Sequence, residues 1–274
     1  MLSGEIQFCI GYSEPEAGTD LAALRTKAVK DGDEYVVNGQ KMWTSLASES
    51  HYCWLAVRTD PDAPKHKGIS IMAVDMDDPG ITVDNLHLLS THDIAAVFYD
   101  DVRVPASRLV GEENKGWNYI TNQLNHERIT IAAPGLLQPA YDDVVAWAAA
   151  TKDSSGQRVI DQEWVQVNLA RVHAGLEFLR LANWKTAWDA TNGNMDVAMA
   201  STIKVFGTEW FLESFRLLME IVGPRSYLER NSVDDQVAGR LETLYRSLII
   251  LTFGGGTNEV QRDIIAMAGL WMPR

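Results

Sequence analysis

Glu127 and Arg128, adjacent in the run "NHERITIA", bring a carboxylate and a guanidinium together at one point of the chain. Adjacent helical residues point about 100° apart, so these two side chains do not pair with each other. One interpretation is an ordinary solvated helix face. The other rests on Ile129 and Ile131, apolar residues that follow directly and draw Glu127 partly inward. A carboxylate near apolar surface gains a raised pKa, which suits a general base.

Two polar stretches near the N-terminus carry hydroxyl groups, and each has two interpretations. "YSEPEAGTD" (Tyr12–Asp20) is either a turn between strands or a loop that aims hydroxyls and backbone N–H groups at a ring or a phosphate. "KMWTS" (Lys41–Ser45) contains a tryptophan, which in a strand usually packs in a core or an interface. A tryptophan followed by two hydroxyl residues also suits a planar cofactor whose edge accepts hydrogen bonds.

Three glycines open the run "FGGGTNEVQRDIIA" (Phe253–Ala266). This run is a phosphate cradle, a helix-opening turn, or an active site that lacks its working residue. The sequence contains no HExxH, CxxC, GxSxG or Walker A motif, and its six histidines show no metal-ligand spacing. We therefore expect no metal site and exclude the metallohydrolase, serine hydrolase and P-loop classes.

The elements that position these residues change character near residue 110. Up to about residue 108 the pattern is that of strands, in "YCWLAVRT", "GISIMAVDM", "ITVDNLHLL" and "AAVFYDDVRV". Asn38-Gly39, flanked by apolar runs, predicts a hairpin turn. Together these signals predict an antiparallel sandwich or barrel.

From about Gly116 the apolar residues follow a helical period. Asp196 is a candidate N-cap and Gly223 a candidate stop for one long helix, while Pro134 and Pro139 interrupt the first helical segment. About five helices with short loops predict a bundle, among them helices over residues 117–150, over "DDQVAGRLETLYRSLIIL" and over residues 257–270. We place two domains at residues 1–110 and 111–274. One single helical stripe is formed by Val165, Leu169, Val172, Leu176 and Leu179.

The composition limits the partners. The 274 residues carry a formal net charge of −13, which argues against nucleic acid or an anionic membrane surface as the main partner. No apolar run is long enough to cross a membrane. Cys9 and Cys53 are too few for a disulfide framework and fit a reducing cytoplasm, which is the expected location.

Five motifs, in order and at matching spacing, resemble the acyl-CoA dehydrogenase family from about residue 5 to the C-terminus. They are "GYSEPEAGTD", "VNGQKMWTS", "DVRVPASRLVGEENKGW", "ASTIKVFG" and "GGGTNEVQRDIIA". Each motif alone is weak, whereas the ordered set is specific. The resemblance implies an α+β fold, with a middle β-domain followed by a C-terminal four-helix bundle. The family's N-terminal helical domain is expected to be absent from this chain.

The resemblance further implies FAD-dependent α,β-dehydrogenation of an acyl-CoA thioester. In such enzymes a glutamate removes a proton from Cα while a hydride leaves Cβ for flavin N5, and the electrons pass to an electron-transferring flavoprotein. The cofactor supplies the hydride chemistry, and the protein supplies the base and the positioning.

Residue by residue, the same resemblance assigns contacts to cofactor and substrate. Ser13, Trp43 and Ser45 resemble the residues around the flavin ring, which Ile10 and Tyr12 border through their backbone. Thr257 and Glu259 resemble the pair beside the FAD adenosine and diphosphate. The positions that contact the thioester ligand or its CoA moiety are matched by Thr19, Asn125 and Arg128.

The base departs from the common pattern. Most relatives carry a glutamate directly before "GT" in the C-terminal loop, where this chain has Gly255. The isovaleryl and long-chain types carry it instead in a Glu-Arg pair on the first long helix, which Glu127-Arg128 resembles. We therefore expect Glu127 to be the base. Gly254 and Gly255 would leave room for a branched or bulky acyl group, such as a sterol side chain.

Two further departures bear on assembly. Lys152 and Ser155 in "KDSSGQ" stand near the place of the family's "RxxFG" motif, and Glu220 replaces a glutamine that contacts FAD of a neighbouring subunit. A carboxylate beside a diphosphate would repel it. We therefore expect a homo- or hetero-tetramer, with α2β2 as one form. Alternative functions are a non-catalytic half-site subunit and a flavin-dependent monooxygenase of the same fold.

Overall fold

The computed structural model describes residues 3–89, 93–228 and 236–273. The chain divides into two compact units, one of them containing residues up to Gln123. The other contains residues from Leu124 onward together with Leu89. The division falls inside helix α1 (Gly116–Ile131), and each unit has its own apolar core.

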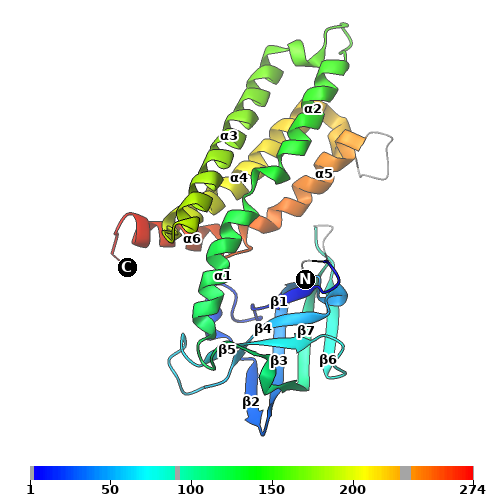
Figure 1. The fold of residues 1–274 in the computed structure, drawn as a ribbon. Helices are drawn as coiled ribbons and strands as arrows, with labels where there is room; N and C mark the ends of the chain where they lie inside the picture. The colour runs from blue at the N-terminus through cyan, green and yellow to red at the C-terminus, as the bar shows by residue number, and fades with distance from the viewer. Residues whose placement is uncertain (1–2, 90–92, 229–235, 274) are drawn as a thin grey trace. The chain divides into compact units, whose positions relative to one another are not determined.

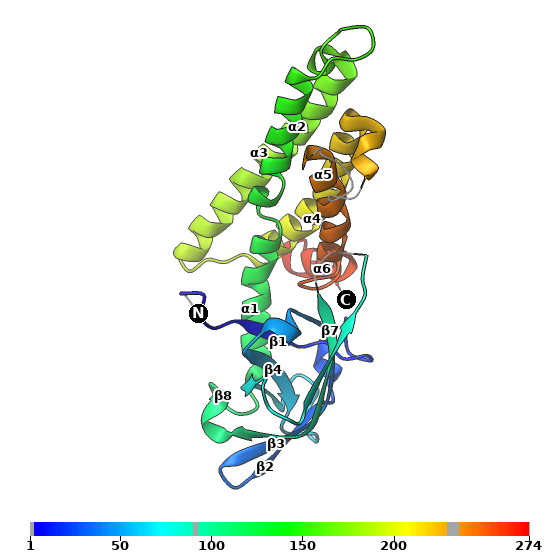
Figure 2. The ribbon, with the colours of Figure 1, turned by 90° about the vertical axis from the view of Figure 1, so that its right-hand side faces the viewer.

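The first unit is built on one sheet, which within the described residues has eight strands (Figure 1, Figure 2). The strand order is β6-β7-β3-β2-β4-β5-β8, and β1 pairs with β4. The β1–β4 and β2–β4 pairings are parallel, and the others are antiparallel. The strands are β1 (Phe8–Gly11), β2 (Lys27–Asp31), β3 (Glu34–Ser45), β4 (Tyr52–Arg58), β5 (Ile69–Asp75), β6 (Ile81–Leu86), β7 (Ile94–Pro105) and β8 (Leu109–Val110).

The hairpin predicted at Asn38-Gly39 is wrong, because β3 runs through both residues without a break. The turn between β2 and β3 is instead Gly32-Asp33, with Gly32 at a φ of +64°. Gly39 marks a register shift against β7, and a Cβ there would stand 2.7 Å from the Cα of Thr26. Asn38 exchanges two 2.9 Å hydrogen bonds with Asp101 across the same irregularity. An Asn-Gly pair therefore serves a β-bulge as readily as a turn.

The second unit contains a four-helix bundle, which confirms the predicted α+β class (Figure 1). Its helices are α2 (Gln138–Ala150), α3 (Glu163–Thr191), α4 (Val197–Val222) and α5 (Gln236–Leu248). A further helix, α6 (Asn258–Ile264), packs against α4. Two residues of the helix predicted over "DDQVAGRLETLYRSLIIL", Asp234 and Asp235, lie outside the described residues.

The predicted helix signals are confirmed. The side chain of Asp196 accepts hydrogen bonds from the backbone N–H groups of Ala198 and Met199, and Gly223 ends α4 at a φ of +78°. Between Ile131 and Gln138 the helix is broken at Pro134, because proline offers no N–H and its ring clashes with the preceding turn. All five residues of the predicted stripe on α3 are buried in the bundle core.

Among the described residues, no helix is both long and apolar enough to span a membrane.

Candidate active site

Arg128 is a buried residue of α1 with only 8% of its surface exposed, so the solvated-face interpretation is wrong for it. Its Nη1 donates to Asn125 Oδ1 at 2.7 Å, and its Nε donates to the carbonyl oxygen of Gly255 at 3.1 Å. Burial lowers the pKa of Arg128, and the neighbouring Glu127 carboxylate opposes that shift. The guanidinium therefore joins α1 to the glycine loop, which we define as residues 252–257.

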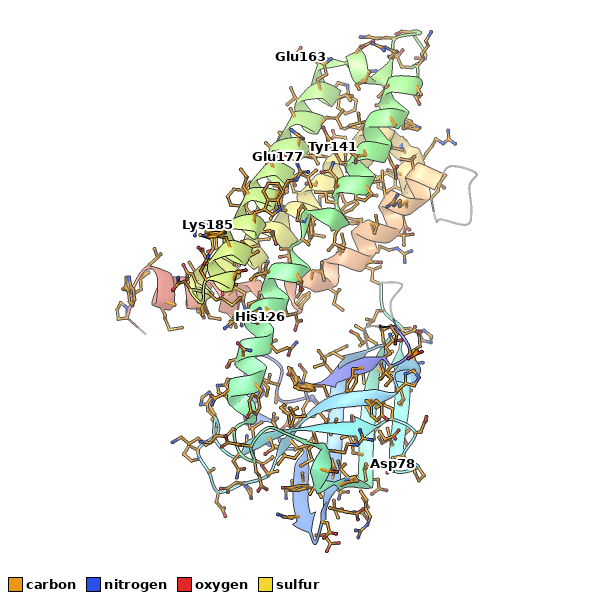
Figure 3. The ribbon with its side chains drawn as sticks, viewed as in Figure 1. Asp78, His126, Tyr141, Glu163, Glu177 and Lys185 are labelled. Atoms are coloured by element: carbon orange, nitrogen blue, oxygen red, sulfur yellow. The ribbon has the colours of Figure 1, made fainter. Side chains whose placement is uncertain are left out.

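Glu127 is half-buried on the same helix, and Figure 3 labels its exposed neighbour His126. Its Oε1 lies 3.9 Å from the point where a Cβ on Gly255 would stand. Glu127 and Gly255, which are distant in sequence, therefore lie close together, and Ile131 Cδ1 stands 3.1 Å from the same Cβ position. The structure brings Asn125, Glu127, Arg128 and Gly255 together.

The glycine loop takes a conformation that favours glycine. Gly255 and Gly256 have φ values of +68° and +95°, in the left-handed region that residues with a Cβ rarely adopt. A Cβ on Gly254 would meet only the carbonyl oxygen of Ile250, at 3.8 Å. Thr257 then begins α6, and its side-chain oxygen accepts from the N–H of Val260 at 3.4 Å. The helix-opening interpretation of this run is confirmed, and Glu259 lies exposed in the first turn.

Lys204 on α4 is fully buried beneath this loop, and sequence reasoning assigned it no role. Its Nζ donates to the carbonyl oxygens of Thr252 at 3.0 Å and Gly256 at 2.8 Å, and to Asn258 Oδ1 at 2.7 Å. The sequence feature that could have revealed the role of Lys204 is its place between Ile203 and Val205 in a helix whose other residues are largely buried. A charge at such a position needs a dedicated set of hydrogen-bond partners.

The two polar stretches of the first unit are tied together by a second buried lysine. Lys41 Nζ donates to the carbonyl oxygen of Tyr12 at 3.1 Å and to Glu14 Oε1 at 2.7 Å, with no exposed side-chain surface. The Glu14 carboxylate also accepts from the backbone N–H groups of Arg25 and Thr26. Met42 N–H donates to the Ser13 carbonyl oxygen at 2.8 Å. "YSEPEAGTD" is therefore a braced turn, closed by paired backbone bonds between its Glu14 and Ala17.

The residues predicted to contact the flavin ring lie on these two braced stretches. Trp43 is 55% exposed at a φ of +64°, in the β3–β7 register shift, so it does not belong to the core. Tyr12 is buried, and its hydroxyl donates to Gln123 at 2.8 Å and accepts from Trp54 Nε1 at 3.0 Å. Its side chain is therefore committed to packing. The remaining predicted contacts of this unit are the exposed Ile10, Thr19 and Ser45 and the half-buried Ser13.

The segment that replaces the "RxxFG" motif is a self-contained turn. Asp153 Oδ1 accepts from the backbone N–H of Ser155 at 2.8 Å and from its hydroxyl at 2.6 Å, and these bonds lower the Asp153 pKa. Lys152 and Ser155 are exposed, and Glu220 is exposed on α4, where it accepts from Asn168 at 3.4 Å.

In the described part of the chain, no group of histidine, cysteine, aspartate or glutamate side chains is placed to hold a metal ion.

Comparison with known families accounts for both units. Residues 9–102 match the acyl-CoA dehydrogenase middle domain, and residues 114–270 match the acyl-CoA dehydrogenase C-terminal domain. The chain belongs to the acyl-CoA dehydrogenase family of oxidoreductases.

Individual relatives are similar over nearly the whole chain. Acyl-CoA dehydrogenase FadE26 of Mycobacterium tuberculosis is 53% identical over 99% of this chain and 70% of its own length. A subunit of the ChsE4-ChsE5 complex from Mycobacterium tuberculosis superposes with a TM-score of 0.91 at 53% identity, covering 99% of this chain and 70% of that one. The Tcur3481-Tcur3483 steroid ACAD superposes with a TM-score of 0.92 at 47% identity, covering 100% and 70%.

Proposed function

We propose that this chain catalyses the FAD-dependent α,β-dehydrogenation of an acyl-CoA thioester with Glu127 as the base. The observation that carries the proposal is the 3.9 Å between Glu127 Oε1 and the Cβ position of Gly255. The carboxylate thus reaches the space beside the residue that replaces the common family base. The glycine leaves that space free of a second carboxylate, so Glu127 meets no like charge there.

The chain's own residues hold and move one proton in this reaction. Glu127 accepts the proton from Cα of the thioester and becomes a neutral carboxylic acid. The buried Arg128, fixed by Asn125 and by the Gly255 carbonyl oxygen, supplies a positive charge next to the carboxylate. We assign the thioester and its CoA moiety to contacts with Thr19, Asn125, Arg128, Gly254 and Gly255.

FAD fits the residues present in the first unit. An indole that is 55% exposed on a braced strand offers a flat apolar surface, and Ser13 and Ser45 offer hydroxyl donors. Ile10 and Tyr12 complete the proposed ring contacts through their backbone, while Thr257 and Glu259 are assigned to the adenosine and diphosphate. FAD, when bound, accepts the hydride released from Cβ, and its electrons pass to an electron-transferring flavoprotein.

We propose a bulky, sterol-derived acyl group as the substrate class. Gly254 and Gly255 add no side chains near Glu127; a Cβ on Gly254 would meet only the Ile250 carbonyl oxygen at 3.8 Å, whereas one on Gly255 would stand 3.1 Å from Ile131 Cδ1. The similarity to a steroid ACAD at 47% identity supports the same class.

We further propose that the chain works in a tetramer with subunits of two kinds. Two of its structural relatives are complexes named for two different chains. The self-contained Asp153 turn and the exposed Glu220 carboxylate argue against a conventional cofactor contact at those places. The outer face of α3 also presents an apolar stripe suited to a partner, formed by the exposed residues Trp164, Val167, Phe178, Leu181 and Trp188.

The spectrum of the purified protein, alone and with co-expressed partner, tests this function. We expect bound flavin absorbance that is bleached anaerobically by a sterol-side-chain acyl-CoA. A colourless protein in both preparations would favour a non-catalytic subunit. Activity only with a flavin reductase and oxygen would favour the monooxygenase, and bleaching by short straight-chain acyl-CoA alone would remove the proposed substrate class.

A further inference from the structure

We propose that Lys204 is a positioning residue that holds the glycine loop in its left-handed conformation and so keeps the space beside Glu127 open. The part of this proposal that concerns catalysis rests on the function proposed above. The part that concerns the loop stands on the geometry of the second unit alone.

Lys204 has as many N–H donors as there are acceptor oxygens around its ammonium group. An ammonium carries three N–H donors and no acceptor. Three oxygens surround it within 3.0 Å, the carbonyl oxygens of Thr252 and Gly256 and Oδ1 of Asn258. One side chain thereby fixes the start of the glycine loop, its end, and the first residue of α6.

Asn258 is itself held in place, which makes the arrangement rigid. Its Nδ2 donates to Thr208 Oγ1 at 3.1 Å and to Glu209 Oε1 at 3.2 Å, both on α4. The middle of the loop is held from two other elements, because the Gly255 carbonyl oxygen accepts from Arg128 Nε and from Gln261 Nε2 at 3.3 Å. Three of the loop's carbonyl groups therefore accept from buried side-chain donors, and Lys204 supplies two of these four bonds.

Burying the charged ammonium of Lys204 costs free energy, which indicates that its hydrogen bonds to the loop are functionally important. Burial, followed by the positive charge of Arg128 on α1, lowers the pKa of Lys204, which lies at about 8. Glu259 on α6, Glu209 on α4 and Glu127 on α1 oppose that shift. A neutral amine has only two donors and turns a lone pair toward an oxygen, so loss of the proton removes one of the three bonds.

Proton linkage fixes the sign of the pH effect that Lys204 has on global unfolding and on local opening of the loop. In the unfolded chain a lysine keeps its proton up to about 10.5, so between about pH 8 and that value the unfolded state binds more protons. Lys204 thus makes the free energy of unfolding rise with pH in this window. An opening of the glycine loop that exposes Lys204 to water restores its ordinary pKa, so this opening should likewise become less favourable as the pH rises from about 8 to 10.5.

Hydrogen exchange of the peptide covering residues 252–261 tests the proposal without flavin or acyl-CoA. Lys204→Met removes the charge and all three donors but keeps an unbranched side chain. We expect faster exchange in this peptide and unchanged exchange in the α4 core around Phe211 and Phe215. Ser214→Ala is the matched control, because Ser214 is buried on the same helix and its hydroxyl has no partner among the described residues.

The wild-type protein supplies a second arm that needs no variant. After correction for intrinsic exchange, protection of residues 252–261 against local opening should rise above about pH 8 while the α4 core stays protected. Unchanged exchange in Lys204→Met, or pH-independent protection of the loop in the wild type, would overturn the proposal.

The catalytic consequence is read separately in the flavin-bound protein. Displacing a reacting group by about 1 Å can cost about 100-fold in rate. We expect Lys204→Met to reduce the rate constant of flavin reduction by about 10- to 100-fold, with flavin content unchanged. A loosened loop without this rate effect would leave the loop assignment intact and contradict the catalytic one.

Discussion

The buried cations of the described chain share one task, which is to bind backbone carbonyl oxygens of loops. Lys41 binds the carbonyl oxygen of Tyr12, and Arg128 binds that of Gly255. Arg58 binds those of Ala22, Leu24, Lys65 and Lys67, and Lys204 binds those of Thr252 and Gly256. Irregular loops have no ladder to satisfy their carbonyl groups, so a buried donor fixes their shape.

The Glu14–Lys41 pair gives a prediction at this scale. Replacing Glu14 with Gln leaves the Lys41 ammonium buried without its counter-ion, which should cost about 3–5 kcal/mol of the free energy of unfolding. Glu16→Gln, on the same turn, removes an exposed partner of Arg25 and should change stability very little. Chemical denaturation of both variants checks this, and equal stabilities would show that the buried pair does not brace the turn.

The same pair predicts how stability responds to acid. Burial raises the pKa of Glu14, but Lys41 and three hydrogen bonds outweigh it and hold the pKa below its ordinary value of 4.5. The contribution of this carboxylate is therefore complete above that value and lost as the pH falls below it. Wild-type stability should drop in this acid window, and Glu14→Gln should show a smaller drop.

At the scale of elements, the ends of helices and the periodicity of their buried residues were predictable from the sequence, whereas the structural role of the Asn38-Gly39 glycine was not. The α3 stripe, the Asp196 cap and the Pro134 break depend on local sequence alone, and the structure confirms them. The Asn38-Gly39 hairpin failed because the strand partner Asp101 lies far along the chain. The role of Lys204 could not be predicted for the same reason, since the oxygens that accept its hydrogen bonds lie about fifty residues away in the sequence.

The N-cap of α4, Asp196, allows a prediction about the stability of the protein. Asp196→Ala removes the acceptor for two backbone N–H groups and should destabilise the protein by about 1 kcal/mol. Asp196→Asn keeps an acceptor oxygen and should recover most of that loss. Thermal unfolding midpoints of the two variants test the assignment, which fails if Ala and Asn behave alike.

At the scale of the whole molecule, the second unit presents apolar surface that a solitary chain would leave in water. Leu181 is 61% exposed and Trp188 is 72% exposed on α3. Placing a charge at the centre of this stripe, as in Leu181→Lys, should weaken assembly. Native mass spectrometry should then show smaller species than the wild type at equal concentration, and an unchanged mass would remove α3 from the interface.

Glu127 as the base is the central claim, and one rate constant tests it most directly. Flavin reduction by acyl-CoA is measured anaerobically in Glu127→Gln and in Glu163→Gln, whose carboxylate begins α3 at the far end of the bundle from His126 (Figure 3). We predict a fall of about 100- to 10,000-fold in Glu127→Gln with bound flavin unchanged, and a wild-type rate in Glu163→Gln. A wild-type rate in Glu127→Gln would contradict the assignment.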